Sequence, residues 1–470
     1  MVFSSAIFLF AFLPIVFGLC MLPVSIKFKN IVLIIASLFF YAFGEPLYVF
    51  LMIGSSIWNY IFGYMLGPSS EGKEKYRKII LVIAIIVNIG MLGVFKYTGF
   101  IIDNINKGLH AGISFKEIAL PIGISFFTFQ ALSYVCDVYR DPKLSQKNYL
   151  NVLLYISMFP QLVAGPIVKY SDINEQINER QFDTVEISNG ISRFCKGLFK
   201  KMFLANVCAV IADDIFALNI NEYGAILAWL GAIAYALQIY YDFSAYSDMA
   251  IGLGHMFGFS YKENFNHPYC ATSIKDFWSR WHISLSTWFK EYVYIPLGGN
   301  REGKFKTERN KMTVFLLTGI WHGANWTFIL WGIIHGVFNV LEDTILPIRK
   351  LKIKVIANIY TLLVAVTAFV FFRADSIGKG LAFVNAMFTN FWINTKTSRT
   401  FLEYMNLYNI VTLIVAIIFA YPVSQKIDEV LKKKFKNISR GYACAAYVLL
   451  FLCMLRLSSG AYNPFIYFRF

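Results

Sequence analysis

Long apolar runs recur along almost the whole chain, and they constrain its fold more than any other feature. A helix of about 20 apolar residues crosses the hydrocarbon core of a bilayer and satisfies its own backbone hydrogen bonds there. The runs lie near residues 3–24, 30–44, 48–66, 79–101, 119–136, 150–168, 190–216, 223–241, 312–340, 353–372, 408–424 and 441–458. They predict an all-α integral membrane protein, a helix bundle with roughly 9 to 12 spans.

The composition fits a protein that lies in lipid. Hydrophobic residues make up 57% of the 470 residues and charged residues only 15%, against about a quarter charged in a soluble domain. In so apolar a chain, the net charge of +15 indicates basic cytoplasmic loops, and we expect no nucleic-acid partner. The seven scattered cysteines form no CxxC pair and are expected to be small core or lipid-facing residues.

No fixed-period repeat and no low-complexity linker divides the chain. We therefore expect one polytopic membrane domain over residues 1–470, with its core motifs in 119–341. Gly, Pro and Gln interrupt the runs at 119–136 and 150–168, which predicts broken or re-entrant helices there. The apolar N-terminus lacks a basic n-region and a cleavage site, so a retained first span is expected.

The loop charges predict an orientation in a cell membrane. Lys27 and Lys29 follow the first span, the turn at 44–46 has no Lys or Arg, and the next loop is basic again. The basic residues just before the last span are Lys432, Lys433, Lys434, Lys436 and Arg440. Because positive loops stay in the cytoplasm, both termini are expected outside it, with the tail 458–470 on the outer face.

His322 is the strongest single candidate for chemistry. It follows Trp321 inside a run that is otherwise apolar, where desolvation favours the neutral imidazole that accepts a proton. Gly319 and Gly323 flank it and would let another helix or a substrate approach closely. Asn325, three residues on, is expected at a neighbouring helical position, where it could fix the tautomer of the ring. This equipment suits general-base acyl transfer.

Two carboxylates, Asp242 and Asp248, stand at the end of another apolar run. A charge at bilayer depth is costly, so such residues usually face a cavity or a partner. The simpler interpretation, which we weigh equally, is that they cap helices or pair with arginines such as Arg280.

An amphipathic helix is predicted for the stretch that follows. Steps of three and four place one set of side chains on a single face: Trp278, Trp281, Leu285, Trp288 and Tyr292. The opposite side carries Arg280, Ser284, Thr287 and Glu291. Such a helix suits a membrane interface, with tryptophans at headgroup depth. His282 lies near the boundary between the faces, as a structural residue or as one that positions substrate.

Three other kinds of site are weighed against acyl transfer. No metal site is expected, because His282 and His322 are 40 residues apart and no HExxH or Cys pair is present. A serine elbow of the GxSxG type is also missing from the sequence. A proton-relay histidine of a transporter stays open on chemistry alone. His335 is interpreted as a packing residue.

At these residues the sequence resembles the membrane-bound O-acyltransferase (MBOAT) family, in the bacterial branch that O-acetylates alginate. The resemblance covers nearly the whole chain, including the segments 121–130, 159–167, 242–254, 263–266 and 277–301. Two departures are mild: Ala245 stands where relatives commonly have glycine, and His255 where they often have arginine. Neither touches the expected base.

The resemblance implies a many-helix body whose central tunnel joins a cytoplasmic funnel to the outer face. It implies that His322 is catalytic, with His282 as its polar companion. The expected substrate or funnel residues are Arg280, Asp242, Asp248, Asn325, Trp281 and Trp321. A cytoplasmic thioester, acetyl-CoA or an acyl carrier protein, would donate the acyl group, with no permanently bound cofactor. A polysaccharide outside would receive it, with an extracytoplasmic SGNH-type acetyltransferase as partner.

The C-terminal segment 463–470 also resembles the family's ending. Aromatic tails with one tyrosine occur in partner peptides of the related D-alanyl system, and we hypothesise that Tyr467 relays the acyl group. The alternative is that this tail is an aromatic interface anchor.

Alternatives remain open for the acceptor of the acyl group and for the class of function. D-alanyl transfer to teichoic acid and peptidoglycan O-acetylation are related activities. A transporter or export channel without chemistry would explain the spans, but not the Trp321-His322-Gly323 and 277–282 blocks together. A scaffold for a polymer synthase is compatible with the enzyme role.

Overall fold

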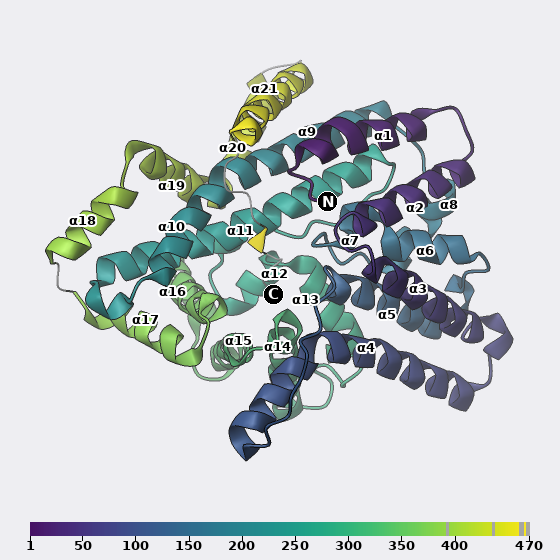
Figure 1. The fold of residues 1–470 in the computed structure, drawn as a ribbon, viewed down its shortest axis with the longest axis horizontal. Helices are drawn as coiled ribbons and strands as arrows, with labels where there is room; N and C mark the ends of the chain where they lie inside the picture. Colours follow the sequence, from purple (N-terminus) through teal and green to yellow (C-terminus); the bar gives the residue numbers. More distant parts are fainter. Residues whose placement is uncertain (392–393, 435–437, 460–464, 467–470) are drawn as a thin grey trace. The chain divides into compact units, whose positions relative to one another are not determined.

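A computed structural model describes residues 1–391, 394–434, 438–459 and 465–466, with only the backbone of 432 and 438–440 (Figure 1). Throughout these residues the regular structure is helical, without a strand. This confirms the all-α fold expected from the apolar runs.

Contacts divide the chain into two compact units. The first comprises residues 1–194 and 248–262, and the second comprises 195–247 and 263–470. Two helices, α9 (Thr184–Phe199) and α11 (Ala225–Met256), contribute to both units. The single domain expected from the sequence stays a prediction, and each unit is described by itself.

The first unit is built around a helix that is buried almost along its whole length. This helix, α5, packs against α3, α4 and α6. The helices of the unit before α9 are α1 (Leu13–Met21), α2 (Ile26–Ala42), α3 (Tyr48–Met65), α4 (Glu74–Leu109), α5 (Ile124–Arg140), α6 (Tyr149–Ser157), α7 (Phe159–Leu162) and α8 (Tyr170–Glu179). The run at 150–168 is broken at Met158, between α6 and α7, as predicted. The run at 119–136 instead gives one continuous helix that begins at Ile124.

The second unit contains the segments that the sequence singled out. Its helices after α9 and besides α11 are α10 (Asn206–Ala217), α12 (Ile274–Arg280), α13 (Ile283–Phe289), α14 (Lys304–His322), α15 (Trp326–Thr344), α16 (Lys354–Arg373), α17 (Ile377–Thr389), α18 (Thr395–Tyr404), α19 (Leu407–Ala420), α20 (Val423–Lys434) and α21 (Ile438–Ser458). The antiparallel neighbours α14 and α15 pack together, and α16 packs on α15 (Figure 1). A short π-helix, Lys200–Ala205, connects α9 to α10.

Among the described residues, four helices are long and apolar enough to cross a membrane: α4, α11, α16 and the 441–458 part of α21. The bent pair α18 and α19 makes five if it forms one span. The sequence predicted 9 to 12, but several apolar runs fold into shorter helices, such as Phe8–Met21, in which a π-helical turn continues into α1. Only 22% of the apolar window of α4 is buried, against 78% of that of α11. Helix α4 therefore offers its apolar side chains to lipid, and α11 belongs to the interior.

The cysteines are all unpaired: Cys20, Cys195, Cys208 and Cys453 are buried, Cys136 and Cys270 are half-buried, and Cys444 is exposed. This agrees with the expected core or lipid-facing role. The expected orientation stays a prediction. Lys436, one of the basic residues on which it rests, lies outside the described residues.

Candidate active site

His322 is the last residue of α14, and a tight helix crossing fixes its place. Gly319 lies one turn earlier, where a Cβ atom would come 2.5 Å from the carbonyl oxygen of Phe328 and 3.3 Å from Cα of Gly332. The close approach expected at Gly319 is therefore real, and α15 is the helix that uses it. Gly323 then ends α14 in an extended conformation, with φ −172° and ψ 158°.

Aromatic rings surround the imidazole of His322, which is 6% exposed. The ring centroids of Trp321, Trp331 and Phe372 lie 4.9, 5.0 and 5.0 Å from that of His322. Trp331 and Phe372 come from α15 and α16. This apolar shell separates the imidazole from water.

A small cavity opens beside His322. Its lining residues are Ile239, Phe243, Trp281, His322, Trp331, Phe369, Phe372 and Ile466. The volume is about 20 Å³, which is enough for a water-sized group. The histidine is therefore the titratable side chain of an otherwise apolar chamber within the second unit.

His282 is fully buried and occupies a break between two short helices. Its backbone has φ 44°, and α13 begins at the next residue. Oδ1 of Asn264 accepts the backbone N–H of Ser284 at 3.1 Å and lies 3.2 Å from Nδ1 of His282. Because Oδ1 is an acceptor, Nδ1 of His282 carries the proton. Its Nε2 has no hydrogen-bond partner among the described residues, so a lone pair is left in a buried place.

The break at His282 corrects the prediction of one amphipathic helix. Helix α12 ends at Arg280 and α13 starts at Ile283, because the backbone and side chain of Asn264 cap the start of α13. The tryptophans on the expected face are buried in protein and do not line a headgroup surface. Their exposed fractions are 9% for Trp278, 3% for Trp281 and 5% for Trp288.

His282 and His322, the two histidines expected in the site, both pack against the indole ring of Trp321. The ring centroid of Trp321 lies 6.1 Å from that of His282 and 4.9 Å from that of His322. Trp281 lines the cavity beside His322. The structure thus brings His282, Trp281, Trp321 and His322 together in one unit.

The two carboxylates do not pair with Arg280, whose Nε donates a 2.7 Å hydrogen bond to Asp276. Asp242 forms a buried ion pair with Lys201 in the second unit. Asp248 belongs to the first unit and accepts hydrogen bonds from Arg193. The interpretation that the carboxylates pair with arginines is correct for Asp248, although the arginine is not Arg280, and wrong for Asp242, whose partner is a lysine. A substrate or funnel role for either carboxylate stays a prediction.

Asn325 has a different position from the one expected. Helix α14 ends before it, and its Oδ1 accepts the backbone N–H of Thr327 at 3.1 Å as the N-cap of α15. Its Nδ2 donates to the carbonyl oxygen of Asp375 at 3.3 Å. Asn325 therefore starts α15 and does not lie at a neighbouring position of the helix that carries His322.

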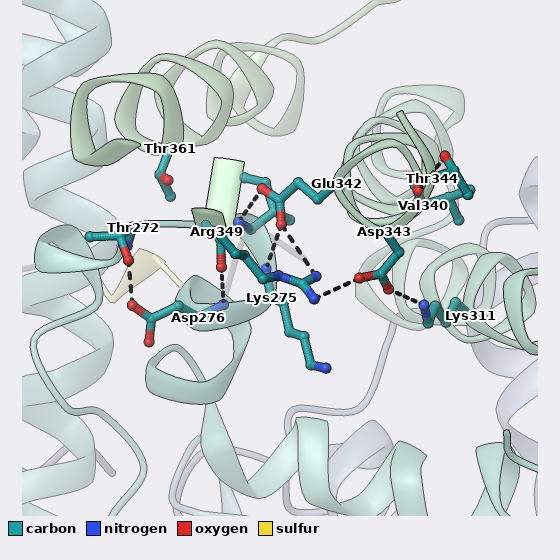
Figure 2. Close-up of polar contacts among 12 residues, drawn as sticks. Thr272, Lys275, Asp276, Lys311, Val340, Glu342, Asp343, Thr344, Arg349 and Thr361 are labelled. Carbon is teal, nitrogen blue, oxygen red and sulfur yellow. Dashed lines mark hydrogen bonds and ion pairs between the residues drawn. The ribbon is translucent and has the colours of Figure 1, made fainter. Parts of the chain in front are cut away.

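A buried carboxylate at the far end of α15 anchors α12, as Figure 2 shows. Oε1 of Glu342 accepts the backbone N–H of Ile274 at 2.6 Å, and Oε2 accepts that of Lys275 at 3.4 Å. Arg349 pairs with Asp343 at 2.6 Å and lies 3.6 Å from Glu342 (Figure 2). A carboxylate on the first N–H groups of a helix satisfies donors that have no partner in the helix. Glu342 therefore holds the helix that leads to Trp281 and His282.

Sequence reasoning did not name as site residues six of the eight residues that line the cavity: Ile239, Phe243, Trp331, Phe369, Phe372 and Ile466. His335, interpreted as a packing residue, contacts the ring of Trp331 at a centroid distance of 5.1 Å. Both nitrogens of His335 are buried without a hydrogen-bond partner among the described residues. The spacing of Trp331 and His335, one helical turn apart, was the available signal. Tyr467, the expected relay, lies outside the described residues.

Comparisons with known proteins identify the family of this chain. Residues 73–381 match the model of the MBOAT, membrane-bound O-acyltransferase family. The chain is 38% identical to the probable alginate O-acetylase AlgI of Pseudomonas putida, over 100% of both chains. It is 34% identical to the peptidoglycan O-acetyltransferase of Helicobacter pylori, over 100% of this chain and 98% of that one.

More distant similarity reaches the teichoic acid D-alanyltransferase of Bacillus subtilis, at 30% identity over 46% of this chain and 57% of that protein. The family model covers more than half of the chain, and the first two relatives match along its full length. The chain is a multi-pass membrane acyltransferase, a member of the membrane-bound O-acyltransferase family.

Proposed function

We propose that this protein takes an acetyl group from a cytoplasmic thioester and passes it across the cell membrane for O-acetylation of an extracytoplasmic polysaccharide. Acetyl-CoA or an acylated carrier protein is the donor, and an SGNH-type acetyltransferase outside is the partner. The observation that carries the proposal is the buried imidazole of His322, at the wall of a small apolar cavity at the end of α14.

The reaction uses His322 as a general base. The imidazole accepts the proton of an acceptor hydroxyl, and the hydroxyl oxygen attacks the carbonyl carbon of the thioester. The C–S bond breaks, and the leaving thiolate takes the proton from the imidazolium, so the products are an ester and a free thiol. A positioned base of this kind contributes roughly 10²- to 10⁴-fold to the rate.

His282 supports this step as a neutral polar companion. Its protonated Nδ1 is held by Asn264, and its Nε2 can accept a hydrogen bond from a hydroxyl group. In the loop between α12 and α13, burial lowers the pKa of His282 to about 3. The ring therefore stays neutral and does not compete for the proton of the acceptor.

The outward route of the acyl group ends, in this proposal, at Tyr467. A phenol can form an ester, and it would pass the acyl group to the extracytoplasmic partner. The residue before it, Ile466, lines the cavity of His322, which supports a tail that reaches the reaction chamber.

The acceptor is proposed as alginate or another exopolysaccharide, because the relative from Pseudomonas putida is named for alginate and matches over the full length. Peptidoglycan is the second candidate, on the strength of the full-length similarity to the Helicobacter pylori protein. Mass spectrometry of cell-surface polymers, with and without the gene, tests the proposal. The polymer that loses O-acetyl esters is the acceptor, and unchanged esters on every polymer would refute the function.

A further inference from the structure

A buried ion pair fixes Phe465 and Ile466, the two described residues between 460 and 470, to the second unit. Asp242 of α11 is 1% exposed and pairs with Lys201. Its second oxygen, Oδ2, accepts the backbone N–H of Ile466 at 2.7 Å. A carboxylate that is desolvated and charge-paired makes a strong acceptor. The backbone of Ile466 is therefore fixed to the core of the second unit.

The neighbouring residue gives the same attachment a second contact. The ammonium group of Lys201 lies 4.7 Å from the ring centroid of Phe465. That ring packs edge-on against Tyr246 of α11, at a centroid distance of 5.0 Å. A cation over an aromatic face is attractive, and more so when it is desolvated. Phe465 and Ile466 are 3% and 4% exposed, so both are packed as core residues.

Ile466 then presents its side chain to the chamber of His322. It shares the lining of the cavity with Ile239, Phe369 and Phe372. The free volume is only about 20 Å³, so each further methylene of an acyl chain has to displace one of these side chains. Close-packed interiors resist such added groups.

We propose that Ile466, held by Asp242 and Lys201, is a specificity-determining residue that limits the transferred acyl group to two carbons. The inference rests on the proposed function, because it assigns the acyl group to the cavity of His322. Replacing Ile466 with alanine removes three carbons from the wall and creates room for a longer chain.

The test compares acetyl-CoA, propionyl-CoA and butyryl-CoA as donors in membranes from the native cells, which contain the natural acceptor. The variants are Ile466→Ala, Ile466→Val and Ile211→Ala. Ile211 is a matched control, because it is a buried isoleucine of the same core that does not line the cavity. The readout is the ratio of propionyl to acetyl ester formed, which does not depend on the amount of folded protein.

We expect the ratio to rise about tenfold in Ile466→Ala, since one methylene in an apolar pocket is discriminated by roughly 10- to 200-fold. Ile466→Val should shift it in the same direction by less, and it decides the matter if the alanine variant does not fold. Ile211→Ala should keep the wild-type ratio. If both Ile466 variants transferred acetyl normally and kept the wild-type ratio of propionyl to acetyl ester, the inference would be wrong but the proposed function would stand. Wild-type membranes that form no ester, either from acetyl-CoA or from an acetylated carrier protein, would refute the proposed function, and the inference with it.

Discussion

Gly319 of α14 and Gly332 of α15 lie against each other where the two helices cross. A Cβ atom built on Gly332 would come 2.4 Å from the carbonyl oxygen of Phe315 and 3.1 Å from Cα of Gly319. These are backbone atoms, so they cannot move aside as a flexible side chain does. The crossing sets the position of His322, which lies one turn further along α14. It also places the ring of His322 against that of Trp331 on α15.

The first prediction concerns this crossing. Gly332→Ala should push α14 away from α15 and lower the free energy of unfolding by about 1–3 kcal/mol. Acyl transfer should fall more than tenfold. Gly90→Ala in α4 is the control, because a Cβ there meets nothing within 4 Å, and alanine favours a helix by about 1 kcal/mol over glycine. Melting curves in detergent and ester formation in membranes measure both effects. If the two variants had the same melting temperature and the same rate of ester formation, the account of a close crossing between α14 and α15 would be wrong.

The second prediction concerns the buried pair. Lys201→Met leaves the carboxylate of Asp242 without its cation, and breaking a buried pair costs about 3–5 kcal/mol. Adding Asp242→Asn removes the stranded charge, so the double variant should be more stable than Lys201→Met alone. Denaturant or thermal unfolding of the purified proteins measures the difference.

Lys379→Met is the matched control for that pair. Its partner is Asp375, both side chains are 69% exposed, and exposed pairs contribute at most about 1 kcal/mol. If Lys201→Met destabilised the protein no more than Lys379→Met, the pair would not anchor Phe465 and Ile466.

The third prediction is a pH dependence of stability. Burial lowers the pKa of His282 to about 3 from an ordinary value of 6.5, so the unfolded chain binds a proton that the folded chain excludes. The contribution of this residue is complete above pH 6.5 and is lost as the pH falls toward 3. Melting temperatures between pH 7 and pH 5 should fall more steeply for the wild type than for His282→Gln. Parallel slopes would show that His282 is not buried as neutral imidazole.

The fourth prediction concerns the proposed relay. Tyr467→Phe removes the hydroxyl that would carry the ester, so polymer acetylation in cells should be lost. Tyr447→Phe is the control, because that ring on α21 is 70% exposed and has no part in the proposal. Mass spectrometry of the polymer compares the two variants. Full acetylation in Tyr467→Phe would leave the tail as an anchor only.

The sequence predicted well where a local pattern decides the structure. The apolar runs gave the helices, and the lone imidazole in an apolar run marked His322, which the structure buries among aromatic rings. The interrupted run at 150–168 gave the break between α6 and α7. Each of these signals lies within about 20 neighbouring residues.

The sequence failed where a distant residue overrides the local pattern. The amphipathic period across 278–292 predicts one helix, but Asn264 hydrogen-bonds to Ser284 and ends that continuity at His282. Likewise, the partner of Asp242 is Lys201 and the second donor to it is Ile466, 224 residues away. No periodicity in the chain carries such pairings, because they depend on tertiary packing.

The most direct measurement of the central claim is thioester consumption by His322→Ala. Membranes with the wild type, His322→Ala or His255→Ala are supplied with acetyl-CoA, and both free CoA and ester are measured. His255 is a matched histidine of the first unit, where its imidazole lies 2.7 Å from Glu186. We predict a loss of roughly 10²- to 10⁴-fold for His322→Ala and wild-type rates for His255→Ala. Ester formation at the wild-type rate in a correctly inserted His322→Ala protein would contradict the role of His322 as the catalytic base.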